Sequence, residues 1–156
     1  MTRESGTAHP RTPGSRLRAG ARLFPTTPPA IFTTRRIVLS LRVLTAATLL
    51  DVLAQAALAG LFVTGDVDML SWHHDNATLL ITLVELQALV AAPLWFRRVG
   101  PRTPVVANLL LVALALTQFS LGEDRVLTVH LPLGMTIFGL SALLTVWAWR
   151  LPVGGE

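Results

Sequence analysis

Four long apolar stretches dominate the pattern of hydrophobic and polar residues along this chain. They cover residues 37–63, 72–96, 104–121 and 127–149, and short polar segments separate them. An α-helix rises about 1.5 Å per residue, so about 20 apolar residues cross the hydrocarbon core of a bilayer, which is roughly 30 Å thick. Each stretch reaches the minimum of about 17 residues that a span requires. We therefore predict an all-α fold, an integral membrane four-helix bundle whose short loops join antiparallel neighbours in an up-down-up-down order.

The chain before the first apolar stretch has a different character. Residues 1–34 contain five prolines and five arginines and show no apolar periodicity, so they cannot bury enough surface to order themselves. We predict a disordered, Arg/Pro-rich cytoplasmic tail over residues 1–34, a four-helix membrane domain over 35–150 and a short tail over 151–156. A cleaved secretory signal is disfavoured because the first apolar stretch is too long. A transit peptide and a wrongly assigned start codon stay open as interpretations of the leader.

Arginines flank the four stretches asymmetrically. Seven fall on one side of the predicted membrane: Arg35, Arg36, Arg42, Arg97, Arg98, Arg102 and Arg150. Only Arg125 falls on the other side, so the positive-inside rule predicts that both chain ends are cytoplasmic. Tryptophans agree with this orientation, because Trp95, Trp147 and Trp149 would mark the inner interface and Trp72 the outer one.

The amino-acid composition narrows the class of protein further. Hydrophobic residues make up 52% of the chain, which is more than a soluble domain needs for its core, and charged residues make up only 14%. All 13 basic residues are arginine, as is typical of proteins translated from GC-rich DNA, so we predict a bacterial inner-membrane protein. The absence of cysteine excludes disulfides, thiolate metal sites and iron–sulfur clusters. Nucleic acid is not an expected partner, because the arginines flank apolar runs and do not gather on one folded face.

Polar residues inside the predicted spans are the first candidates for function. Asp51 and Gln55 are four residues apart and share one helix face, Glu85 lies in the middle of the second span, and Asn108 and Gln118 lie in the third. Polar groups in a span usually face the bundle interior, so we expect Asp51, Gln55 and Glu85 to be buried. They would form a proton or cofactor site, or the protonated carboxyls would only hydrogen-bond to neighbouring helices.

Histidines near the outer ends of two spans are the second set of candidates. His73 and His74 lie at the start of the second span and His130 at the start of the fourth, and both spans run inward, so these side chains share a leaflet. If Ser71 caps the second helix, His74 lies inside that helix. If Asp75 is the cap, His74 falls outside it.

A haem group would suit this arrangement of histidines. Haem needs one or two neutral imidazoles, an apolar slot between helices and polar groups near water for its propionates. Gly134 lies one turn below His130 and would leave room for a flat macrocycle, while Arg125 and Gln118 lie at the depth of the propionates. The alternative is that the imidazole rings merely lie at the membrane interface, where amphipathic side chains are at home.

Several motifs carry a resemblance to a known family. The stretch QAALAGLFVTG, residues 55–65, a polar loop, a histidine opening the second span and His130 in HLPLG resemble one four-helix half of the haem A synthase family. The chain also resembles a set of small, uncharacterised actinobacterial membrane proteins with the same plan. The resemblance covers roughly residues 37–150. It implies that His74 and His130 are axial haem ligands and that a homodimer rebuilds the eight-helix molecule.

Two positions depart from that family. It has a carboxylate three residues before the second-helix histidine and an arginine directly after it, whereas this chain has Ser71 and Asp75 there. The synthase reaction is therefore not implied, and no residue pattern in the chain specifies an enzymatic activity.

The sequence thus predicts a membrane protein that binds b-type haem through His74 and His130, with Arg125 near a propionate, for electron transfer or haem handling. The competing class is a non-enzymatic membrane scaffold or small accessory subunit whose polar interior only sets the helix register. A transporter is disfavoured because four helices are few for alternating access. The expected partners are the lipid bilayer and a second copy or a larger membrane complex.

Overall fold

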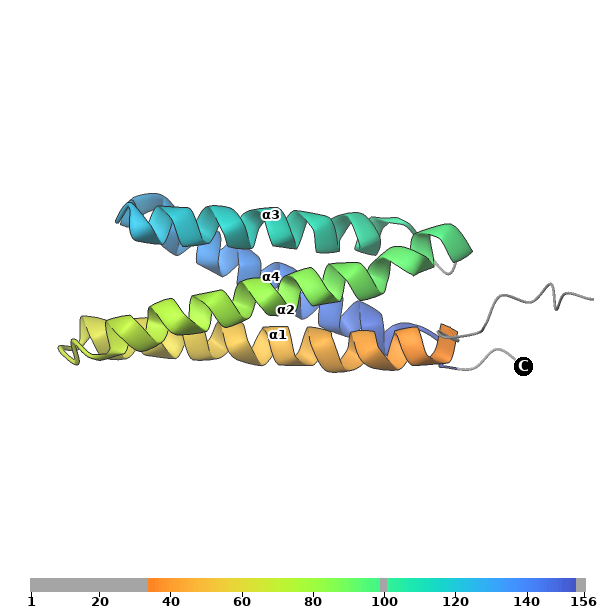
Figure 1. Ribbon diagram of the computed structural model, residues 1–156, viewed down its shortest axis with the longest axis horizontal. Coiled ribbons are helices and arrows are strands. Elements are labelled where there is room, and N and C mark those ends of the chain that lie inside the picture. Colours follow the sequence, from red (N-terminus) through yellow and green to blue (C-terminus); the bar gives the residue numbers. More distant parts are fainter. Residues whose placement is uncertain (1–33, 99–100, 154–156) are drawn as a thin grey trace, which may run out of the picture. The chain divides into compact units, whose positions relative to one another are not determined.

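The computed structural model describes residues 34–98 and 101–153, which form four α-helices (Figure 1). They are α1 (Thr34–Val63), α2 (Met69–Arg97), α3 (Thr103–Glu123) and α4 (Leu127–Arg150). No strand occurs in this part of the chain, and every helix is long and apolar enough to cross a membrane. The prediction of a four-helix membrane bundle is confirmed, and the protein is an integral membrane protein. Of the predicted tail, residues 1–33 lie outside the described residues.

The second helix begins three residues before the predicted span, at Met69. Asp68 occupies the N-cap position without a side-chain capping bond, and the Ser71 hydroxyl donates a hydrogen bond to the Asp68 carbonyl at 2.7 Å. The sequence suggested either Ser71 or Asp75 as the cap of this helix, and neither residue caps it. His74 lies in the second turn of α2. The way α2 is turned about its own axis therefore decides which way the His74 side chain points.

Each helix packs against two neighbours in the described part of the chain. The backbones of α1 and α3 both approach those of α2 and α4, whereas the backbones of the pairs α1–α3 and α2–α4 lie further apart. The helices α2 and α4 thus lie diagonally opposite one another, and side chains that meet between them must cross the interior. The short α1–α2 loop turns at Gly65, whose φ of +112° is a conformation that glycine adopts most readily.

The two ends of the bundle carry different kinds of side chain. The α1–α2 and α3–α4 loops form one end, which we call the histidine end because His73, His74 and His130 lie there. The opposite end, which we call the arginine end, carries Arg35, Arg36, Arg42, Arg97, Arg98, Arg102 and Arg150. Seven of the eight arginines that the sequence analysis names therefore lie at the end where α1 begins, and Arg125 lies at the other end.

Arg42 joins α1 to the last turn of α4 at the arginine end. Its guanidinium donates hydrogen bonds to the carbonyl oxygens of Ala148, Trp149 and Leu151 at 3.2, 3.1 and 2.9 Å. The last carbonyls of a helix have no partner within the helix, and a cation also interacts favourably with this end of the helix dipole. Arg42 therefore satisfies the backbone where α4 ends.

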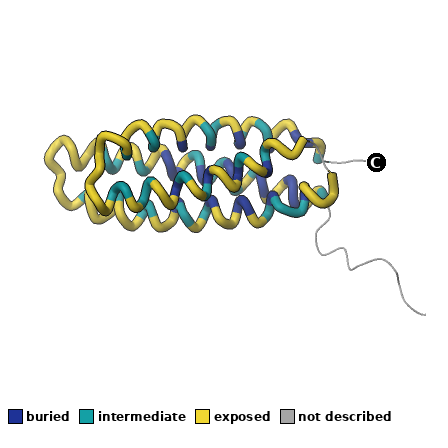
Figure 2. The backbone as a smooth tube through the Cα atoms, turned by 90° about the horizontal axis from the view of Figure 1, so that it is seen from above, coloured by how far each residue is buried: buried dark blue, intermediate teal, exposed yellow. Residues whose placement is uncertain are grey.

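The apolar core occupies the arginine end and the middle of the bundle (Figure 2). One buried cluster lies near the arginine end and contains Ile37, Val38, Leu41, Ala91, Leu94, Val105, Ala148 and Leu151. A second cluster lies further along the helices and contains Val52, Leu80, Val84, Leu111, Ala115, Ile137 and Leu144. By contrast, no residue of the segments 53–79 and 116–136 is buried. The histidine end therefore has no close-packed apolar core of its own.

Candidate functional site

His73 lies near the start of α2 and is held against α1 by hydrogen bonds to the backbone. Its Nδ1 atom lies 3.1 Å from the carbonyl oxygen of Gln55. A carbonyl oxygen can only accept, so Nδ1 must carry the proton and donate it. In the neutral ring the other nitrogen, Nε2, then has a free lone pair. The Gln55 amide also donates to the His73 carbonyl at 2.9 Å, so the two residues exchange two hydrogen bonds.

His130 is oriented in the same way from the other side of the bundle. Its Nδ1 atom lies 3.0 Å from the backbone carbonyl oxygen of Gln118 on α3, so Nδ1 is again the donor and Nε2 has the free lone pair. The ring lies close to Gly122, where an added Cβ would come within 3.1 Å of the His130 Cε1 atom. A glycine at position 122 therefore allows the imidazole to approach α3.

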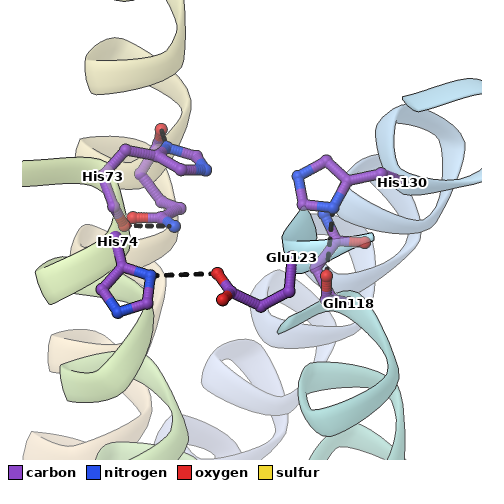
Figure 3. A network of polar contacts seen from close by, with 6 residues as sticks. His73, His74, Gln118, Glu123 and His130 are labelled. Carbon is purple, nitrogen blue, oxygen red and sulfur yellow. Dashed lines mark hydrogen bonds and ion pairs between the residues drawn. The ribbon is translucent and has the colours of Figure 1, made fainter. Parts of the chain in front are cut away.

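The two imidazole rings face one another across the interior of the histidine end. Their centroids are 6.3 Å apart and their planes are inclined by 54°. Figure 3 shows the rings extending toward each other from α2 and α4, with the ring nitrogens that make no hydrogen bond turned inward. With metal–nitrogen bonds of about 2 Å on either side of one ion, two imidazole centroids lie roughly 6 Å apart. The spacing and the orientation therefore suit ligation of one metal ion by both Nε2 atoms.

The number of available ligands discriminates between kinds of metal site. Within residues 34–98 and 101–153, no group of three or more His, Cys, Asp or Glu side chains could hold a metal ion. A structural or catalytic zinc ion usually takes three or four protein ligands. Haem iron needs only one or two, because the macrocycle supplies the others. A pair of imidazoles with free Nε2 atoms has the number of protein ligands that haem iron needs.

His74, the residue predicted to pair with His130, points elsewhere. Its Nδ1 atom lies 3.1 Å from Oε1 of Glu123 on α3, and the side chain is 49% exposed (Figure 3). The ring also packs against Phe119, at a centroid distance of 5.5 Å. Successive residues of an α-helix point about 100° apart, so the two adjacent histidines cannot both face the interior. The ring opposite His130 therefore belongs to His73, whereas the sequence predicted that His74 lies there.

The space predicted beneath His130 is filled by the side chain of Gln118. A Cβ added to Gly134 would lie 3.2 Å from the Nε2 atom of Gln118, so the small residue accommodates this amide and leaves no open slot. The Oε1 atom of Gln118 is buried and has no hydrogen-bond partner. Arg125 lies in the α3–α4 turn with a φ of +57° and is exposed. Gln118 is thus close to the imidazole pair, and Arg125 lies on the surface of the same end.

The polar residues predicted for the first span lie inside the bundle. The Asp51 side chain is buried, with 8% of its surface exposed, and its Oδ2 atom has no partner. Gln55 is partly buried and accepts a hydrogen bond from the Asn76 amide at 2.8 Å. The same amide lies 3.3 Å from the Asp51 carbonyl oxygen. Asn76 therefore fastens α2 to α1 one turn inside His73, a role that the sequence did not indicate.

Glu85 departs from the expectation that all three intramembrane polar residues face inward. It is exposed on α2. His74 and Glu85 are 11 residues apart, or about three helical turns, and so point to nearly the same side. Both side chains lie on the exposed side of α2, and the prediction that Glu85 is buried is wrong for this bundle.

A buried chain of polar side chains joins α1, α2 and α3 in the half of the bundle toward the arginine end. The Thr48 hydroxyl donates to Oε1 of Gln87 at 3.0 Å, and the Gln87 amide donates to Oδ1 of Asn108 at 2.6 Å. The Asn108 amide then donates to the Pro104 carbonyl at 2.8 Å. Every hydrogen-bonding group in this chain has a partner, which is typical of a structural network that sets helix register.

The fold and the site together define an integral membrane bundle with an inward-facing pair of oriented imidazoles at one end. No protein-family model, curated protein or solved structure matches the chain. The resemblance to half of the haem A synthase family therefore stays a prediction from the motifs quoted above.

Proposed function

We propose that this protein binds one b-type haem at the histidine end of the bundle, where His73 and His130 would hold it. The observation that carries the proposal is the geometry of the pair, whose centroids are 6.3 Å apart and whose Nδ1 atoms are both hydrogen-bonded to backbone carbonyls. A hydrogen bond from the second ring nitrogen is the usual device that orients a metal-ligating histidine. It also increases the basicity of the ligating nitrogen.

The packing of the histidine end supports the same proposal. No residue of segments 53–79 and 116–136 is buried, so a macrocycle entering between α2 and α4 would displace little close-packed core. The Gln118 side chain, which covers Gly134, would have to move. Its Oε1 atom has no hydrogen-bond partner, so this movement would break no hydrogen bond made by that oxygen.

Electron transfer is the activity that best suits two imidazole ligands. Haem held by His73 and His130 would supply one-electron chemistry. His73 and His130 would hold the cofactor and Gln118 would contact its edge. Arg125 is exposed at the same end and would remain available to a propionate. The arginine end would face the cytoplasm of a bacterium, as the seven-to-one distribution of arginines indicates.

The visible spectrum of the purified protein tests the proposal. The full chain would be produced in cells supplied with haem and purified from membranes in a mild detergent. We expect a Soret band and, after reduction, the sharp bands of a haem with two imidazole ligands. The variants His73→Ala and His130→Ala should each lose this spectrum. His74→Ala is the matched control, because it removes an adjacent but exposed histidine, and its spectrum should be unchanged.

Two outcomes would contradict the proposal. A folded but colourless wild-type protein from haem-supplied cells would favour the alternative, a membrane subunit without a cofactor. Loss of the spectrum in the His74 variant, together with its retention in the His73 variant, would instead favour the pair that the sequence alone predicts. Circular dichroism of each variant would verify that its helices are intact.

A further inference from the structure

Glu85 lies near the middle of α2 on the outer surface of the bundle. It follows Met69, the first helical residue, by 16 positions (85 − 69) and precedes Arg97, the last, by 12 (97 − 85). At about 1.5 Å per residue, the carboxyl group is therefore about 24 Å and about 18 Å along the helix from its two ends. In a membrane-spanning helix these distances put Glu85 deep in the hydrocarbon layer, and Glu85 is exposed.

Two hydroxyl groups lie on the same side of α2 as Glu85. Thr78 and Thr82 precede it by seven and three residues, and both are exposed. At 100° per residue, these three side chains and that of Leu89 fall within about 60° of one another. The buried residues of α2 project from the opposite side of the helix. We call the exposed surface the α2 face; it consists of Thr78, Leu79, Thr82, Glu85, Leu86 and Leu89.

Lipid is a poor environment for this surface. A charged side chain at the centre of a membrane helix is costly to insert, and ionisable residues in spans almost always face protein or water. A protonated carboxyl group still loses hydrogen bonds in hydrocarbon. Among the described residues, Glu85 has no hydrogen bond or ion pair, and Thr82 bonds only to the Thr78 carbonyl of its own helix. A partner outside this chain would satisfy the carboxyl group.

We propose that the α2 face is the contact surface between two copies of this chain, which pack α2 against α2 about a two-fold axis along the membrane normal. Two copies inserted in the same direction place each residue of one α2 at the same depth as the identical residue of the other. Glu85 would then meet Glu85 of the partner subunit. The inference stands apart from haem binding, because it rests on a different surface of the bundle.

The chemistry of the α2 face is self-complementary, and this favours a second copy over another protein. A protonated carboxyl group both donates and accepts hydrogen bonds, so two Glu85 side chains can pair without a basic residue. The hydroxyl of Thr82 likewise donates and accepts. The flanking leucines are exposed by 50% at Leu79, 45% at Leu86 and 69% at Leu89. They supply the apolar rim that packs around the polar centre.

Disulfide trapping tests this contact directly, because the chain contains no cysteine. Thr82→Cys in the full chain, reconstituted in lipid and treated with a copper oxidant, should form a covalent dimer. A disulfide requires Cα atoms about 4.4–6.8 Å apart, so efficient trapping reports a close helix contact. Leu110→Cys is the matched control. Leu110 is exposed on α3 and lies 13 residues from the histidine end of its helix (123 − 110), as Thr82 does in α2 (82 − 69).

Substitution of Glu85 tests the chemistry of the contact. In otherwise wild-type protein, Glu85→Leu should raise the dimer dissociation constant by about tenfold, because it removes interhelical hydrogen bonds inside the membrane. Glu85→Gln should keep the dimer, because an amide also donates and accepts. Sedimentation equilibrium in detergent would measure the dissociation constants. The spectrum of any bound haem should not change with either variant, so failure of this inference is distinguishable from failure of the proposed function.

Three results would overturn the inference. The first is a wild-type protein that stays monomeric in lipid. The second is equal cross-linking of the Thr82 and Leu110 cysteine variants, which would indicate random collision. The third is a Thr82 cysteine that cross-links in native membranes only to a different protein, which would assign the α2 face to a heterologous partner.

Discussion

Gln87→Leu is the substitution whose effect on stability follows most directly from the structure. Gln87 is buried and joins three helices, because it accepts from Thr48 on α1 and donates to Asn108 on α3. Leucine has a similar size and no hydrogen-bonding groups, so the substitution removes both hydrogen bonds and leaves the packing volume nearly unchanged. The loss of stability should therefore report the polar interactions.

The two former partners of Gln87 should respond differently. Thr48 can turn its hydroxyl to the carbonyl four residues earlier in α1, as exposed threonines of this bundle do: Thr82, Thr117 and Thr136. Asn108 has no such alternative for its Oδ1 atom, because its amide is already bonded to Pro104. A buried polar group left without a partner costs about 1–3 kcal/mol. We expect the free energy of unfolding to fall by about that amount.

The double variant Gln87→Leu/Asn108→Leu provides the internal check. It removes the stranded oxygen together with its former donor, and replacement of both partners by apolar groups can be nearly neutral. The double variant should therefore be more stable than Gln87→Leu alone. Unfolding in mixed detergent micelles, followed by circular dichroism, would measure the differences. Thr117→Val, at an exposed position, should change stability by less than about 0.5 kcal/mol. A double variant as unstable as the sum of its single variants would refute the argument.

Three further predictions concern the site and the topology. Gly122→Ala should weaken haem binding by about tenfold in a titration, because its Cβ would meet His130 at 3.1 Å, whereas Gly139→Ala has nothing within 4 Å and should bind haem normally. Asp51→Asn should unfold at nearly the wild-type temperature, because an amide can replace a protonated carboxyl group, whereas Asp51→Arg should be strongly destabilised. A reporter fused after Glu156 should be active in the cytoplasm and one inserted near Asp68 outside it, and the reverse pattern would contradict the arginine rule.

The spans were predictable from the sequence because the bilayer imposes a minimum length on each apolar stretch. The rotation of each helix about its axis was not. In a soluble bundle the polar face of a helix marks the side toward water, but lipid and bundle core are both apolar. No periodic signal in the sequence therefore decides whether His73 or His74 faces inward. The same ambiguity explains why Glu85 was expected inside the bundle and lies outside.

The sequence could not show that a side chain from a neighbouring helix fills the space predicted for haem beneath His130. A small residue one turn below His130 is compatible with a cofactor and equally with a side chain from an adjacent helix. In the structure the Gln118 amide packs against Gly134. The close approach of His130 to Gly122 was also missed, although a glycine beside Glu123 at the end of a predicted span is a visible signal. Both contacts join α3 to α4 across sequence separations that no local pattern encodes.

The two ends of the bundle are stabilised by different means, and this difference bears on how a ligand would act. At the arginine end a buried apolar cluster and the Arg42 hydrogen bonds hold α1 and α4 together. At the histidine end the helices are joined chiefly by polar contacts such as those between Gln55 and His73. A ligand bridging α2 and α4 would add a link between diagonal helices whose backbones lie far apart. Because a ligand stabilises the state that it binds, haem should protect the backbone amides of the histidine end from hydrogen exchange far more than those of the arginine end.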